Sequence, residues 1–199
     1  MASLQPACQA RTGRGLIHRI LGTRLIRLRL VGGALPSAGS AVCNDESHPA
    51  PSGILSVPAL LLDEIRRHGL SAYPEECCGF LIGRAEPAAK RVVDLRRAAN
   101  AREDSRHNRY EIAPGELLEV EKAAVASGLD ILGFYHSHPD HPARPSEFDR
   151  EHAIPWYSYV ILSVASGVPA ELTAWTLRRD RSGFDEETIE AGSDAAAVA

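Results

Sequence analysis

The segment that decides the fold is Asp130-Ile-Leu-Gly-Phe-Tyr-His-Ser-His-Pro139. Its first six residues are mostly apolar and predict a buried strand that runs directly into the histidines. Residues two apart on an extended chain project to the same face, so His136 and His138 offer two imidazoles to one ion at the end of the strand. Pro139 is disfavoured inside a sheet and takes the chain out of it.

The chain continues with six residues and then Ser146-Glu-Phe-Asp149. Pro142 and Pro145 restrict the intervening loop, so the loop can return Asp149 to the two histidines with little loss of entropy. Two imidazoles and one carboxylate suit zinc, and three protein ligands leave a fourth position for water, as in catalytic sites. We therefore expect His136, His138 and Asp149 to be zinc ligands, with a short helix starting near Ser146.

A zinc hydrolase also needs a base beside the water, and Glu76 is the candidate. It comes just before an apolar run, Cys78-Gly-Phe-Leu-Ile-Gly83, which predicts a second buried strand. From the edge of that strand a side chain can reach a site on a neighbouring strand, whereas the adjacent Glu75 faces the other way. Cys77 and Cys78 are expected to be small packing residues and not ligands.

Each of these signals is modest when it is taken alone. A lone His-x-His is common on solvated turns, Ser146 and Asp149 form the pattern of a helix N-cap, and a lone Glu76 is an ordinary surface acid. The joint order and spacing of these residues are what favour a catalytic site.

The remaining periodicity predicts an α/β or α+β domain with a mixed sheet. Helices are expected from Pro58 to near Gly69 and after Pro114. Further strands are expected at 91–95, 109–112, 158–164 and 171–177.

Composition excludes several classes of protein. The 199 residues are 44% hydrophobic and 24% charged, as in a globular domain, and the net charge of -4 gives no reason to expect a nucleic-acid partner. No apolar run approaches the roughly 20 residues of a membrane span. The four cysteines form no disulfide framework, which favours a reducing, cytoplasmic compartment.

Residues 1–53 differ from the rest of the chain. They carry six arginines and no acidic residue before Asp45, and they end in a Pro/Ser/Gly/Ala stretch. A targeting segment has this composition, but a disordered extension or a start codon assigned too far upstream is the preferred interpretation. We expect the folded domain to span residues 54–190 and residues 191–199 to form a flexible tail.

The motifs resemble those of the JAMM (MPN-type) zinc metallopeptidases, whose signature is an upstream glutamate, then H-[ST]-H-P, six residues and S-x-x-D. Here Pro74-Glu-Glu76-Cys-Cys78-Gly79 looks like the family's P-x-E-x-C-G, and the similarity covers roughly residues 54–190. The resemblance implies a curved mixed sheet flanked by helices, related to the cytidine-deaminase fold. It also implies a zinc ion, Glu76 as catalytic base and Ser146 as the donor that stabilises the oxyanion.

The compact body is similar to the small stand-alone bacterial members of that family. Some of these act on ubiquitin-like sulfur-carrier proteins with a Gly-Gly tail, and such a tail can enter a site as an added strand. The predicted function is therefore hydrolysis of an amide bond at such a tail. The alternatives are a zinc peptidase acting on unrelated peptides or cell-wall fragments, and a non-catalytic scaffold. The oligomeric state, including a homodimer, is left open.

Overall fold

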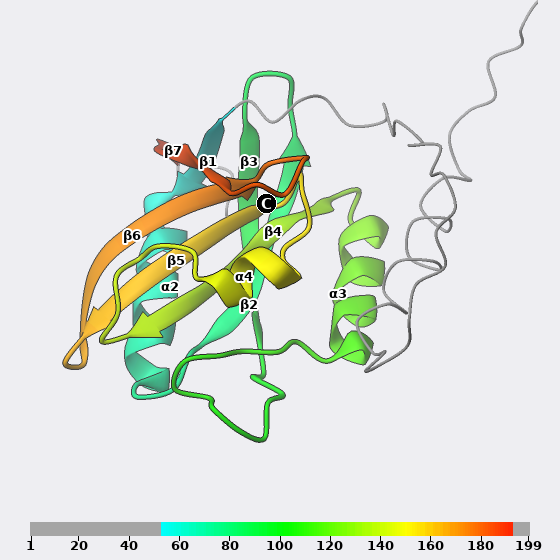
Figure 1. The fold of residues 1–199 in the computed structure, drawn as a ribbon. Coiled ribbons are helices and arrows are strands. Elements are labelled where there is room, and N and C mark those ends of the chain that lie inside the picture. Colours follow the sequence, from blue (N-terminus) through cyan, green and yellow to red (C-terminus); the bar gives the residue numbers. More distant parts are fainter. Residues whose placement is uncertain (1–52, 193–199) are drawn as a thin grey trace, which may run out of the picture. The chain divides into compact units, whose positions relative to one another are not determined.

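The computed structural model describes residues 53–192 as one mixed sheet with flanking helices (Figure 1). The predicted leader, residues 1–53, and tail, residues 191–199, lie outside this range apart from Gly53 and the last two residues of the final strand. The elements follow the order β1 (Ile54–Pro58), α2 (Ala59–Ala72), β2 (Cys78–Ala85), β3 (Lys90–Ala98), α3 (Pro114–Ala126), β4 (Asp130–Pro139), α4 (Glu147–His152), β5 (Ser158–Ala165), β6 (Val168–Leu177) and β7 (Phe184–Gly192).

The strands lie in the order β1-β3-β2-β4-β5-β6-β7, and β1 also pairs with β7, so the sheet closes on itself. The pairs β1–β3, β1–β7 and β4–β5 are parallel, and the other pairs are antiparallel. The predicted mixed sheet with flanking helices is confirmed. Its closure through β1 and β7 was not predicted.

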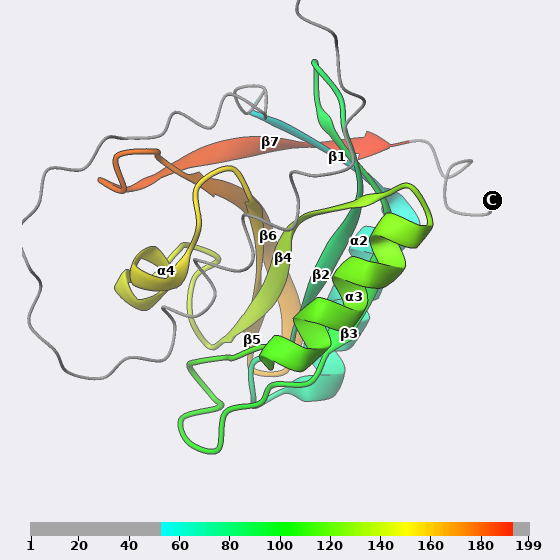
Figure 2. The same cartoon turned by 90° about the vertical axis from the view of Figure 1, so that its right-hand side faces the viewer.

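Burial of both faces explains why β2 is an almost continuous apolar run. Leu81 packs in a cluster with Leu61 and Ile65 of α2. Phe80 and Ile82 point the other way and pack in a second cluster, together with residues of α3. The two helices therefore lie on opposite faces of β2 (Figures 1 and 2). Each fully buried side chain of this kind stabilises the fold by roughly 1.5–3 kcal/mol.

Helix α2 runs three residues beyond its predicted end at Gly69. A Cβ atom on Gly69 would lie 2.5 Å from the Leu162 side chain of β5. Gly69 is thus a point of close contact between the helix and the sheet, and not the end of the helix.

The predicted strand at 109–112 is wrong, because these residues form no strand. Tyr110 and Ile112 both pack against an apolar cluster, and their spacing of two residues resembles the alternation of a strand. Their segment has one backbone hydrogen bond of the kind found between strands, from Ala101 N to Glu111 O at 2.8 Å, and it does not continue into a ladder. The prediction also missed β1 and β7, whereas the other predicted strands and all three helices are present.

None of the helices between residues 53 and 192 is long and apolar enough to cross a membrane.

Candidate metal centre and active site

The two histidines stand at the end of β4, a strand that is paired on both sides. His136 is paired with Cys78 of β2 and with Ile161 of β5, and His138 with Ser163 of β5. His136 is 1% exposed and His138 is 8% exposed. Both imidazoles are therefore held by buried packing at the end of β4, where the chain leaves the sheet.

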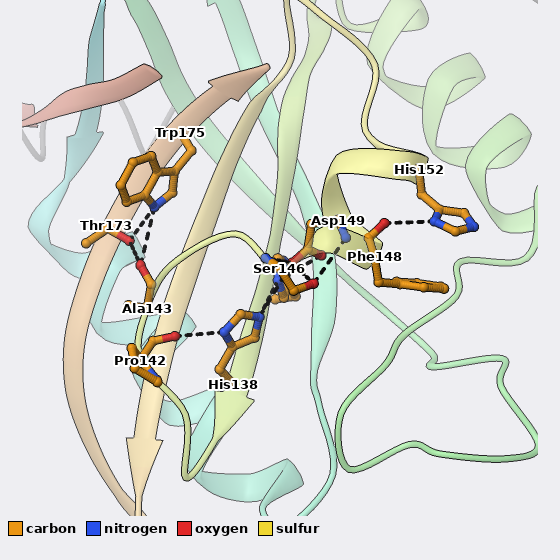
Figure 3. A network of polar contacts seen from close by, with 10 residues as sticks. His138, Pro142, Ala143, Ser146, Phe148, Asp149, His152, Thr173 and Trp175 are labelled. Atoms are coloured by element: carbon orange, nitrogen blue, oxygen red, sulfur yellow. Dashed lines mark hydrogen bonds and ion pairs between the residues drawn. The ribbon is translucent and has the colours of Figure 1, made fainter. Parts of the chain in front are cut away.

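The loop between β4 and α4 is held by three successive carbonyl groups. The His141 carbonyl accepts from Ser163 Oγ at 2.7 Å, and the Pro142 carbonyl lies 2.8 Å from His138 Nδ1. The Ala143 carbonyl accepts from the side chains of Thr173 and Trp175 on β6 (Figure 3). The loop is thereby fixed to β5 and β6, and it brings α4 back over the end of β4.

Helix α4 places Asp149 through a capping box. The Ser146 side chain accepts from Asp149 N at 3.1 Å, and Ser146 N donates to Asp149 Oδ2 at 2.7 Å. The Ser146 hydroxyl also donates to Asp149 Oδ2 at 2.6 Å. The predicted N-cap is confirmed, and the cap fixes the direction of the carboxylate.

The structure brings the three predicted ligands together. His136 Nε2 lies 3.1 Å from His138 Nε2 and 3.5 Å from Asp149 Oδ1, and His138 Nε2 lies 3.8 Å from Asp149 Oδ2. Two atoms bound to tetrahedral zinc at about 2.0–2.1 Å are themselves about 3.3–3.4 Å apart. The spacing of the two Nε2 atoms and the Asp149 carboxylate oxygens fits a single zinc ion.

The protonation of the histidines also fits a cation. A carbonyl only accepts hydrogen bonds, so the contact with Pro142 requires a proton on His138 Nδ1 and, in the neutral ring, leaves the Nε2 lone pair facing the cluster. Burial lowers the pKa of His136 to about 4, although the nearby Asp149 charge acts in the opposite direction. Metal ligation requires neutral imidazole, which burial therefore favours.

Burial would raise the pKa of Asp149, but the positive charge that His136 carries when it is protonated and the hydrogen bonds from Ser146 outweigh this effect and lower that pKa overall. The ionised form of Asp149 is therefore favoured.

Tyr110 packs against the site, and no sequence motif marks it as a site residue. Its ring stacks on His136 with the centroids 4.7 Å apart and the planes 28° apart. His136 Nδ1 is buried and has no hydrogen-bond partner among the described residues. The orientation of the His136 ring therefore depends on packing against Tyr110.

Strand pairing places Glu76 on the same side of the sheet as the histidines. Cys78 pairs with His136, and the neighbouring residues continue this register, because Ser137 N donates to Cys77 O at 3.1 Å. Residues two apart share a face, so Glu76 is directed to the same face as Cys78 and His136. Glu76 is only 5% exposed, unlike an ordinary surface acid.

Burial, together with the charge of Asp149, raises the pKa of Glu76 to about 8. A carboxyl group with a pKa near neutrality can both take and return a proton, as a general base and acid must. The site therefore combines three side chains that could hold a metal ion with a buried carboxyl group.

The other predictions for this region are confirmed. Cys77 and Cys78 are free and buried, and they pack on opposite sides of β2.

Comparison with known proteins defines the class to which this fold and site belong. A family model described as prokaryotic homologs of the JAB domain matches residues 58–178, which is more than half of the chain. The chain belongs to this family, and its resemblance to the JAMM/MPN proteins is confirmed.

Particular relatives are similar over most of their own length. A desampylase of Haloferax volcanii is 36% identical over 117 residues, which cover 56% of this chain and 82% of that protein. A probable TtuB-protein conjugate cleaving protease of Thermus thermophilus is 39% identical over 119 residues, covering 60% and 76%. The solution structure of a Salinibacter ruber protein matches at 47% identity with a TM-score of 0.56, covering 69% of this chain and 91% of that chain.

Proposed function

We propose that this protein is a zinc-dependent peptidase or isopeptidase that hydrolyses an amide bond at the C-terminal tail of a ubiquitin-like or sulfur-carrier protein. The observation that carries the proposal is the convergence of His136, His138 and Asp149 beside the buried Glu76. Relatives named desampylase and TtuB-protein conjugate cleaving protease support hydrolysis of protein conjugates as the reaction.

In this proposal His136, His138 and Asp149 hold the zinc ion. When bound, zinc supplies Lewis-acid activation of a water and of the carbonyl group under attack. The three residues need no rearrangement of the backbone for this role, since β4 and the capping box of α4 already direct their side chains at one point.

Glu76 acts as the catalytic base. It takes a proton from the attacking water and returns it to the departing amine. Its burial supports this role, because burial moves the pKa of a carboxyl group toward neutrality, where the group can both take and return a proton.

Ser146 stabilises the oxyanion that forms on the substrate carbonyl. For this, its proton turns from Asp149 Oδ2 to the substrate, while its oxygen still accepts from Asp149 N and caps α4. A preorganised donor of this kind contributes about 10²–10³ in rate.

The substrate tail ends in Gly-Gly and enters as an extended strand, since two glycines bring a carbonyl to the site without side-chain clashes. The connection between His138 and Ser146 is short, so it carries no long insertion that would cover the site from the end of another protein. We further propose that the protein works in a reducing compartment and that its fold is related to that of the cytidine deaminases.

Mass spectrometry of candidate substrates tests the proposal. Zinc-loaded protein is incubated with a sulfur-carrier protein that bears one extra residue after Gly-Gly, and with a carrier joined to a lysine side chain. We expect the mass of the cleaved carrier to appear, a chelator to prevent it, and a matched Ala-Ala tail to be cleaved much more slowly.

Two results would contradict the proposal. Cleavage restricted to unrelated peptides or cell-wall fragments would show that these are the substrates, and not a ubiquitin-like or sulfur-carrier protein. Retained zinc with no hydrolysis of any adduct would indicate a scaffold.

A further inference from the structure

The segment between β3 and α3, residues 99–113, contacts the proposed site at two points, and we refer to it as the site loop. Its two ends are joined by the side chain of Asn100. Asn100 Oδ1 accepts from Arg102 N and from Glu111 N, both at 3.2 Å, and Asn100 Nδ2 donates to Arg109 O at 3.0 Å. The same Nδ2 donates to Glu76 O at 3.3 Å, outside the loop. All four hydrogen-bonding positions of the amide are thus used.

The backbone of Glu76 depends on this loop. Glu76 precedes β2, which begins at Cys78, and its own backbone N–H and carbonyl bond to residues outside the ladder of the sheet. Its N–H donates to Arg106 O at 2.7 Å, and its carbonyl accepts from Asn100 Nδ2. The site loop therefore holds both polar groups of the Glu76 backbone.

The same amide fixes the backbone on both sides of Tyr110. Asn100 binds the carbonyl of Arg109 and the N–H of Glu111, which are the residues flanking Tyr110. Tyr110 in turn stacks on His136. One side chain thereby connects the backbone of the base to the aromatic residue that packs on a histidine of the metal centre.

We propose that Asn100 is a positioning residue of the active site, which sets the place of Glu76 and of the Tyr110 ring through their backbones without touching the substrate. The proposal rests on the role of Glu76 as base in the proposed function. Misplacing a reacting group by about 1 Å can cost on the order of 10²-fold in rate, so a residue outside the reaction can control it through position alone.

Asn100→Asp tests the proposal because a carboxylate keeps the two acceptor contacts and loses the donor. Its oxygen would then face the carbonyl oxygens of Glu76 and Arg109. Asn108→Asp is the matched control, since it makes the same chemical change and adds the same charge at an exposed position of the site loop. Both variants are measured on the substrate identified for the full chain.

We expect Asn100→Asp to lower kcat about 10- to 100-fold relative to Asn108→Asp, with KM and the dissociation constant of zinc changed less than about twofold. We also expect the Glu76 amide hydrogen to exchange with solvent at least about tenfold faster in Asn100→Asp, because its partner Arg106 O belongs to the loosened loop. The exchange is followed by NMR and needs no substrate.

The outcomes separate the two proposals. If the wild-type protein hydrolyses no carrier adduct, the proposed function has failed, and amide exchange alone decides the role of Asn100. Unchanged kcat and exchange, or a zinc affinity that falls together with kcat, would overturn the positioning role. If Asn100→Asp does not fold, Asn100→Ala is measured in the same way, and failure of both to fold would make Asn100 a residue of general stability and overturn the proposal.

Discussion

Glu76 shows how much of the site is decided at the scale of single residues. It is buried beside Asp149, and its neighbour Glu75 is exposed and pairs with Arg106. The two glutamates are adjacent in sequence but differ in solvation, which separates a proton carrier from a surface charge.

Glu76→Gln should therefore retain zinc and lose turnover. Glutamine is close in shape and is not placed among the ligands, but it cannot accept the proton, so kcat should fall by about 10²–10⁴. Zinc content and hydrolysis of a carrier adduct are the measurements, and Glu75→Gln is the control that should leave both unchanged. Loss of zinc from Glu76→Gln would place this residue among the ligands.

His138→Ala should weaken zinc binding, because two remaining ligands rarely hold the ion. The loss should exceed the roughly 10- to 100-fold that removal of an outer hydrogen-bond partner costs. Competition with a chromogenic chelator measures the affinity. His141→Ala removes an exposed imidazole three residues away and should leave it unchanged. Wild-type affinity in His138→Ala would exclude this residue from the centre.

The residues of the site that can be predicted from sequence are those whose own chemistry and spacing carry the signal. The two histidines, Asp149, Ser146 and Glu76 are of this kind. Tyr110 and Asn100 are not, because an aromatic ring and an amide in a polar loop have no distinctive spacing. Their contacts with His136 and Glu76 cross between separate segments and depend on the fold.

At the scale of elements, the apolar pattern of the sequence is sufficient to predict a strand or helix that buries a continuous face. The strands β2, β4 and β5 are such runs, and each is buried along most of its length. Strand β7 is rich in acidic residues and mostly exposed, so its pairing with β1 and β6 leaves no hydrophobic signature. The short β1 ends at the proline that was read as the start of a helix.

Helix α2 carries a pH-sensitive contact on its inner side. His68 Nδ1 lies 2.9 Å from the hydroxyl of Tyr135 on β4, and the rings meet edge to face. Burial, reinforced by the charge of Arg97, lowers the pKa of His68 to about 4 from its usual 6.5. The unfolded chain therefore binds a proton more readily than the folded chain between these two pH values.

This contact should weaken the protein in acid. The stabilising contribution of neutral His68 is complete above pH 6.5 and is lost as the pH falls through about 4. His68→Gln does not titrate, so it should reduce the loss of unfolding free energy between pH 7 and pH 4 by on the order of 1–2 kcal/mol, allowing for the partial exposure of the ring. Urea unfolding at several pH values measures this, with the exposed His107→Gln as control. Identical pH profiles for His68→Gln and wild type would contradict the assignment.

At the scale of the whole described domain, one interior contact connects strands that are not neighbours in the closed sheet. Lys90 of β3 and Glu187 of β7 form a buried ion pair, with Nζ 3.6 Å from Oε1, and Lys90 also donates to Ser158 Oγ of β5 at 2.9 Å. One side chain thus connects three strands through the interior. A sequence pattern does not predict such a contact, because lysine and glutamate are usually exposed.

Gly133 lies where β4 is most closely packed against its neighbours, and it tests how tightly the metal centre depends on the closed sheet. A Cβ atom there would lie 1.9 Å from the backbone oxygen of Ser158, so Gly133→Ala must push β4 away from β5. We expect a loss of about 2–4 kcal/mol in the free energy of unfolding, together with weaker zinc binding, since both histidines stand on the displaced strand.

Gly115→Ala is the control: nothing lies within 4 Å of its added Cβ, and alanine favours the helix α3, so stability should stay equal or rise by up to about 1 kcal/mol. Chemical denaturation and zinc titration of both variants measure the effect. Wild-type stability in Gly133→Ala would mean that β4 and β5 can separate freely, and that the position of the histidines does not depend on the packing of these two strands.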